Sequence, residues 1–306
     1  MIGLTTAAIA PSASAWTTSE TRSTGRCPTP PPLAITATRT GRIAVHRRRT
    51  TATFSANSRY GEYDWFGGSA PNDLSHYQRF SVGGYDFLHI DLEWEAPGDP
   101  SDSDTPVGWA QGVLDANPET PTILTTRSYL WDEPGEEGRT GFVEAGDDGN
   151  SGQQLFQKLV EPNPQVFMTL NGNFHEATGA DNGEWTQVSG NDAGLDVYEM
   201  LANYQGYPNG GNGWLRLVRF VPGGGSDGRD RIEVRTYLPS REEFRTDDRS
   251  EFSFDLSFAD RFGGSSSGDG DGGGDEGGGI GNETTTPPGT SENGSDTNSG
   301  TADTYL

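Results

Sequence analysis

Apolar residues are concentrated in one part of this 306-residue chain, and their uneven distribution limits what it can fold into. Hydrophobic residues make up 31% of the whole; residues 57–262 have an ordinary share, and both ends are poor in them. A stable domain must bury enough apolar surface to offset the entropy lost on ordering. We therefore expect one core of about 200 residues, flanked by two segments that contribute little to it.

Residues 57–262 contain six segments whose composition is typical of strands. Two further segments place apolar residues at helical spacing, and the second has Ser151 as a candidate N-cap and Pro162 just past its end. Strand and helix alternate in the middle, and the last three strands follow one another, which predicts a mixed α/β layer protein. The predicted strands are 85–94, 121–126, 165–172, 213–221, 231–238 and 251–258, and the predicted helices are 105–117 and 151–163.

The two ends of the chain differ in composition and in charge. Residues 263–306 are mainly Gly, Ser, Thr and acidic residues, which predicts a disordered linker or tail, with N-glycosylation sequons at Asn282 and Asn293. Residues 1–56 carry seven arginines and one acidic residue, a net charge of +6, whereas residues 57–306 carry 14 basic and 44 acidic residues, a net charge of −30. The basic segment has no periodicity and is either a disordered arm or the product of translation in the wrong frame.

The net charge of −24 disfavours two classes of partner. An acidic surface repels the phosphates of nucleic acids and of anionic membranes, so we expect neither as a partner. Only one of the 21 basic residues is a lysine, Lys158, which is typical of proteins from extreme halophiles; the alternative is an acidic mesophilic protein. The single cysteine, Cys27, excludes an internal disulfide framework, and no apolar stretch reaches the roughly 18 residues of a transmembrane helix.

Three segments share features with one enzyme family. In MTLNGNFHE (168–176) an apolar strand runs into Gly-Asn-Phe-His, and GNGWLRLVRF (211–220) is a distinctive later strand. Residues 33–37, read two bases out of frame, permit Gly-Asn-His-Gly. Together these segments resemble the calcineurin-like metallophosphoesterase family, especially its secreted members. The resemblance covers residues 57–262, so it implies only the C-terminal part of that family's domain.

The resemblance implies a mixed-sheet β-sandwich flanked by helices, and a site where two divalent metal ions hold a phosphate ester and activate water. The metal identity does not follow from the sequence. A family strand-end His falls on Arg127, the first His of Gly-His-x-His falls on Asn173, and His175 matches the remaining position. Arginine stays protonated and cannot ligate a cation, and an amide oxygen is a weak ligand for a transition metal. We therefore expect a former metal site that does not retain its ions.

Asp64, Trp65 and His89 have two interpretations each, and His76 has one. Asp64 and Trp65 precede a Gly-Gly turn and are candidates for lining a substrate cleft; aromatic packing under the turn is the alternative. His89 alternates with apolar residues, so we expect a satisfied histidine in the sheet rather than a ligand. His76 is expected in a surface segment.

Asp91, Glu93 and Glu95 alternate along the end of a predicted strand, which would place their carboxylates on one face. We expect a solvated acidic face, and the alternative is a cation site.

Metal-dependent hydrolysis of phosphate mono- or diesters is the activity that the resemblance implies, and the substitutions at the metal positions predict that this chain is inactive. The alternative is a catalytically dead extracellular binding or cell-surface module, and a third possibility is a product of gene decay without function. The sequons and the linker favour an extracellular or cell-surface location, although no intact signal peptide is visible.

Overall fold

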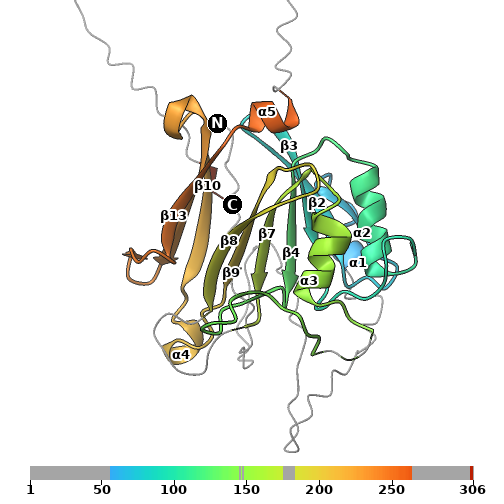
Figure 1. Ribbon diagram of the computed structural model, residues 1–306, viewed down its shortest axis with the longest axis horizontal. Helices are drawn as coiled ribbons and strands as arrows, with labels where there is room; N and C mark the ends of the chain where they lie inside the picture. The colour runs from blue at the N-terminus through green and yellow to red at the C-terminus, as the bar shows by residue number, and fades with distance from the viewer. Residues whose placement is uncertain (1–55, 145, 147, 175–182, 264–303, 306) are drawn as a thin grey trace, which may run out of the picture.

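The computed structural model of the protein describes residues 56–144, 146, 148–174, 183–263 and 304–305. These residues form two β-sheets packed face to face, with helices on the outer face of the larger sheet (Figure 1). The fold is therefore a mixed α/β sandwich flanked by helices, which confirms the predicted fold class. Nearly all of the predicted N-terminal segment and C-terminal tail lies outside the described residues.

The larger sheet has seven strands in the order β1-β2-β3-β4-β7-β9-β8. The four central strands, β3, β4, β7 and β9, run parallel, and β1, β2 and β8 run antiparallel to their neighbours. Central parallel strands are buried on both faces, and β7 is buried over all but its last residue. The strands are β1 (Phe66–Ser69), β2 (His76–Val82), β3 (Tyr85–Asp91), β4 (Thr122–Arg127), β7 (Val166–Gly172), β8 (Glu184–Gly190) and β9 (Asp196–Ala202).

Two helical segments cover one face of this sheet (Figure 1). α2 (Pro106–Asp115) is capped by the side chain of Thr105 and has proline at its first position. α3 (Gly152–Leu155) has Ser151 as its N-cap, as predicted, and Ser151 forms a capping box with Gln154. The helix continues into a π-helical turn, η2 (Phe156–Val160). The core on this face includes Ile90, Leu114, Leu124, Leu159 and Leu201.

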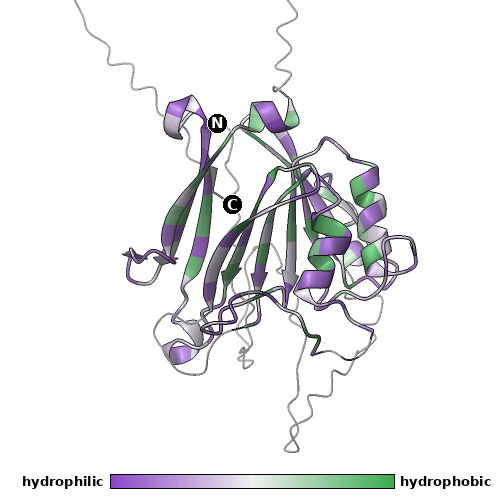
Figure 2. Ribbon diagram, in the orientation of Figure 1, coloured by the Kyte–Doolittle hydropathy of each residue, from purple (hydrophilic) through white to green (hydrophobic). Residues whose placement is uncertain are grey.

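The smaller sheet covers the opposite face, with strand order β12-β11-β10-β14 and β13 also paired with β11. Aromatic rings fill the space between the sheets: the centroid of Phe167 lies 5.4 Å from that of Phe258 and 6.1 Å from that of Phe87. Figure 2 shows hydrophobic and hydrophilic residues mixed along these strands and helices, as expected of elements with one buried face. The strands are β10 (Leu215–Val221), β11 (Asp230–Leu238), β12 (Glu243–Arg245), β13 (Glu251–Leu256) and β14 (Thr304–Tyr305).

A two-stranded ribbon and several short helices complete the described secondary structure. No helix in the described ranges is both long enough and apolar enough to cross a bilayer. The ribbon is β5 (Leu130–Trp131) with β6 (Gly138–Arg139), and the short helices are α1 (Ala56–Tyr60), α4 (Pro208–Gly211), η3 (Ser226–Gly228) and α5 (Phe258–Phe262).

All six predicted strands and both predicted helices are present, with ends that differ by a few residues. The sequence pattern did not indicate β1, β2, β8 or β9. β9 is the most informative miss: it is a buried central strand, but Glu199 interrupts its apolar run. Only a partner from elsewhere in the chain makes that carboxylate compatible with burial.

Candidate functional site

The carboxyl ends of β3, β4 and β7 lie along one edge of the larger sheet, where the ligand sites of α/β sheets gather. After each strand the chain has a non-glycine residue at positive φ: Glu95 at 47°, Ser128 at 54° and Asn173 at 81°. Such residues cost about 1–3 kcal/mol each and are common at functional sites. We define the strand-end cluster as Arg127, Ser128, Glu144 and Asn173.

Arg127 and Asn173, the two positions where the resemblance places metal-binding histidines, are hydrogen-bonded to each other. Arg127 Nη2 donates to Asn173 Oδ1 at 3.0 Å. The amide nitrogen of Asn173 donates to Ser128 Oγ at 2.8 Å and to Glu144 Oε2 at 3.2 Å. Both the oxygen and the nitrogen of the Asn173 amide are therefore hydrogen-bonded to other side chains. The cation that faces the amide oxygen is the guanidinium of Arg127.

Neighbouring groups hold the cluster in this arrangement. Trp94 Nε1 donates to Ser128 Oγ at 2.5 Å, and Asn203, which follows β9, donates to the carbonyl oxygen of Asn173 at 2.8 Å. Ser128 and Asn203 are both buried. Because Ser128 Oγ accepts two N–H hydrogen bonds, its own hydrogen remains available to donate.

Arg127 is a partly buried cation with no carboxylate in salt-bridge contact among the described residues. Its Nε is buried and lacks a hydrogen-bond partner within the same ranges. Burial lowers the pKa of Arg127, and the charge of Glu144 opposes that shift. Because arginine remains protonated at physiological pH, the cluster has a positive centre in a strongly acidic domain.

The described donors do not fit the two metal ions that the resemblance implies. Arg127 offers no lone pair to a cation, and Asn173 Oδ1 already accepts a hydrogen bond from it. His175, the third position, lies outside the described residues. In the part of the chain that the structure describes, no three His, Cys, Asp or Glu side chains are placed to hold a metal ion.

Asp64 and Trp65 do not join the strand-end cluster. They precede β1, the outermost strand, and β2 and β3 separate β1 from β4. The centroid of the Trp65 ring lies 5.4 Å from those of Tyr60 and Tyr63. Their placement away from Arg127 favours aromatic packing around the turn over a shared substrate cleft.

His89 is a satisfied histidine within the sheet, as predicted. Its Nε2 lies 2.6 Å from Thr125 Oγ1, and burial lowers the pKa of His89 while the charge of Asp91 opposes the shift. His76 begins β2, a strand without a fully buried residue, and its side chain is 15% exposed and stacks on the ring of Phe66. The segment is a strand of the larger sheet.

The three carboxylates predicted to share a solvated strand face do not share one. β3 ends at Asp91, and Glu93 accepts a hydrogen bond from Asn72 Nδ2 at 3.0 Å. Glu95 is buried and accepts a hydrogen bond from the backbone amide of Glu144 at 2.8 Å. The prediction fails at Glu95 because the chain turns there and carries the side chain inward.

An aromatic group beside the cluster was not anticipated from the sequence. Phe142 lies 4.9 Å from Trp131 and 5.7 Å from Phe174, measured between ring centroids, and is partly exposed. We call these three residues the aromatic trio. Ser128 and Phe174 could have been found from their positions just after predicted strands. Phe142 could not, because its place depends on the loop after β6.

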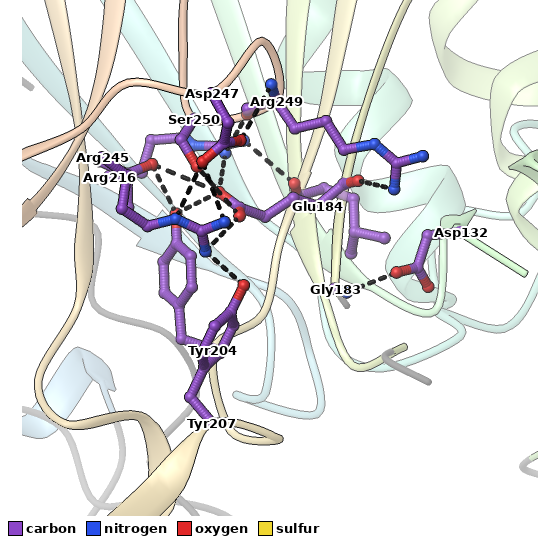
Figure 3. Close-up of polar contacts among 12 residues, drawn as sticks. Asp132, Gly183, Glu184, Tyr204, Tyr207, Arg216, Arg245, Asp247, Arg249 and Ser250 are labelled. Atoms are coloured by element: carbon purple, nitrogen blue, oxygen red, sulfur yellow. Dashed lines mark hydrogen bonds and ion pairs between the residues drawn. The ribbon is translucent and has the colours of Figure 1, made fainter. Parts of the chain in front are cut away.

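A second polar cluster lies at the same edge of the sheet, beyond β9. The carboxylate of Glu184 is fully buried, with Arg216 Nη2 at 2.5 Å and Arg245 Nη1 at 2.9 Å. Figure 3 shows Tyr204 and Ser250 completing its hydrogen bonds. Burial raises the pKa of Tyr204 to about 12. This Glu184 cluster joins β8 of the larger sheet to β10 and β12 of the smaller one.

No protein-family model matches the chain, and no solved structure matches it. The chain is similar to a Bacillus subtilis (strain 168) protein named Uncharacterized protein YvnB, with 29% identity over 219 residues. The alignment covers 70% of this chain and 15% of that protein. The chain thus spans a small part of this relative's length, and what the whole relative does cannot be assigned to it.

Proposed function

We propose that this domain is a metallophosphoesterase-like sandwich that binds a ligand at its strand ends without hydrolysing a phosphate ester. Two facts support the proposal: the resemblance of residues 57–262 to the calcineurin-like family, and the helix-flanked sandwich that this resemblance implies. An extracellular or cell-surface setting is part of the proposal and depends on the linker and its sequons.

One contact carries the proposal, the hydrogen bond from Arg127 Nη2 to Asn173 Oδ1 at 3.0 Å. A dimetal site needs several electron-pair donors converging on the ions. Here two of the expected positions pair with each other, one as donor and one as acceptor. A metal ion beside Asn173 Oδ1 would also face the guanidinium charge, and two unit charges 4 Å apart repel by about 4 kcal/mol at an effective dielectric constant near 20.

The competing function is metal-dependent hydrolysis of phosphate mono- or diesters. The location of the cluster favours it, because β4 and β7 end at the edge where the active sites of α/β sheets gather. The ions would then need ligands from residues outside the described ranges, with His175 the nearest candidate in sequence.

Hydrolysis assays separate the two functions. The full chain is tested on p-nitrophenyl phosphate and bis(p-nitrophenyl) phosphate with added Mn²⁺, Zn²⁺ or Co²⁺. We expect no release of nitrophenol above the metal-only control. Turnover that requires metal and is abolished by EDTA would refute the proposal.

A histidine-restoring double variant, Arg127→His with Asn173→His, tests the ancestry of the two positions. We expect this variant to bind Zn²⁺ more tightly than the unaltered chain in calorimetric titrations, because it replaces a cation and an amide with two imidazoles. A correctly folded double variant with unchanged Zn²⁺ affinity would argue against these positions as former ligands.

A further inference from the structure

We infer that the edge of β10 is a docking site for an extended strand, and that its occupant is the segment of this chain around β14, tethered by residues 264–303. The site belongs to the smaller sheet. The inference therefore goes beyond the proposed function and does not depend on it.

β10 is an edge strand over most of its length. On one side all of its residues, Leu215–Val221, pair with β11. On the other side, within the part of the chain that the structure describes, only Arg219 and Phe220 pair with a strand, and that strand is β14 (Figure 1). The N–H and C=O groups of an unpaired edge can form a ladder with a further extended segment.

The two sheets cover each other unequally. Phe254 of β13 lies 4.5 Å from Tyr198 of β9, and Phe220 of β10 lies 5.6 Å from Phe87 of β3, measured between ring centroids. The smaller sheet therefore extends across the larger one from β9 towards β3, with β10 and the short β14 at that side. The next strand of the larger sheet in this direction is β2.

β2 continues the apolar layer beyond β3. The ring of Phe80 stacks on that of Phe87, with centroids 5.1 Å apart. Phe80 and Val82 pack against the inter-sheet core but are only partly buried. A strand added beside β10 extends the smaller sheet towards β2, so it would remove more of this apolar surface from water.

The chain supplies a strand for this edge from its own residues. Residues 264–303 join Gly263 to Thr304 and reach about 130 Å when fully extended, several times the width of a domain of this size. A tether raises the effective concentration of the strand at its site, which favours the same chain over a second copy. Because few residues pair and closing the loop costs entropy, docking should be reversible.

The first test is hydrogen–deuterium exchange of the full chain, with mass spectrometry of the peptide that contains β10. The variant carries Thr304→Pro and Tyr305→Pro, because proline lacks the N–H that a ladder needs. The control carries Thr285→Pro and Thr286→Pro, the same change within the tether. We expect the β10 amides that face β14 to exchange about threefold faster or more in the variant, and at the unaltered rate in the control.

The second test traps the docked strand with a disulfide in a Cys27→Ser background. Arg219 and Tyr305 are paired in register, and paired residues have Cα atoms about 4.5–5.5 Å apart, which suits a disulfide. Arg219→Cys with Tyr305→Cys is compared with Leu215→Cys and Tyr305→Cys, whose partner on β10 lies about 13 Å farther along the strand. We expect the first pair to oxidise roughly tenfold faster and to remain monomeric on a non-reducing gel.

Unchanged exchange at β10 in the Thr304→Pro, Tyr305→Pro variant, or equal oxidation of the two cysteine pairs, would overturn the docking site. A disulfide-linked dimer whose yield rises with protein concentration would overturn the same-chain occupant in favour of a second copy. Neither readout involves hydrolysis of a phosphate ester, so these failures are distinct from failure of the proposed function.

Discussion

The strand-end cluster and the Glu184 cluster lie at the same edge of the larger sheet, but the arginines in the two clusters have different partners. In the Glu184 cluster two arginines meet one buried carboxylate, and hydroxyl groups complete its hydrogen bonds. In the strand-end cluster Arg127 donates to a neutral amide, its one printed hydrogen bond among the described residues. The difference indicates that a buried charge with counter-ions in contact stabilises the fold, whereas a partly buried cation without a carboxylate in contact among the described residues is a candidate for binding a ligand.

Glu184→Gln should remove the ion pairs of the Glu184 cluster and have the largest effect on the free energy of unfolding. The substitution keeps the side-chain volume but leaves Arg216 and Arg245 without their buried counter-ion. Removing one partner of a buried ion pair costs about 3–5 kcal/mol. Urea unfolding measures the loss.

The control for that variant is Glu251→Gln. Glu251 pairs with Arg235 at 3.0 Å, and both side chains are more than a third exposed. Exposed pairs contribute about 0–1 kcal/mol, so this change should be small. Equal losses in the two variants would show that the Glu184 cluster is no more structural than a surface pair.

Tyr129→Phe extends the comparison to a second buried carboxylate that is paired with an arginine, Glu199 with Arg139. Tyr129 donates to Glu199 Oε2 at 2.8 Å, and both residues are fully buried. Removing a hydrogen bond to a charged group should lower the free energy of unfolding by about 1.5–3 kcal/mol. Tyr198→Phe is the control, because within the described ranges that hydroxyl has only a long hydrogen bond of 3.4 Å, and we expect a loss of less than about 1 kcal/mol.

His89 adds a buried group whose neutral form is favoured by burial. Its pKa is lowered in the folded state by burial, so the unfolded chain binds more protons once the pH falls below about 6.5, the ordinary histidine value. The contribution to stability is therefore present above pH 6.5 and lost as the pH falls through that value toward the folded pKa. His89→Gln should flatten this part of the stability–pH curve measured by urea unfolding. An unchanged slope would assign the pH dependence to other groups.

Arg127→Gln should have the smallest effect on stability, below about 1 kcal/mol. No described carboxylate is left unpaired by the change, and Gln can still donate to Asn173. Arg216→Gln is the matched comparison, because that side chain is buried against Glu184 and its loss should cost several times more. If the two variants unfold at the same urea concentration, the contrast between the clusters fails.

Much of the fold followed from local pattern, and the candidate site followed in part. The end of β4 at Arg127 and the apolar strand that runs into Asn173 were predictable, because strands of 6–7 residues have strong composition signals. The hydrogen bond between them was not predictable. It joins residues 46 positions apart, and it depends on the register of β4 against β7.

Buried carboxylates show most clearly why the rest could not be predicted. Glu95 looked like one of three solvated acids, and Glu199 concealed β9 from a search for apolar runs. Glu199 is buried because Tyr129 and Arg139, 70 and 60 residues away, reach its carboxylate. Such partners cannot be recognised before the strands are ordered in space.

The sequence by itself determined where the core lies and which segments become its main strands and helices. These features depend on composition and short-range spacing, so each segment carries its own signal. Tertiary structure alone decided which charges are paired. Arg216 and Arg127 are the same residue type at strand positions, but the packing of the smaller sheet gives Arg216 a buried carboxylate, and the described structure gives Arg127 an amide. The physical reason is that the free energy of a buried charge depends on its partners, which only the folded chain brings together.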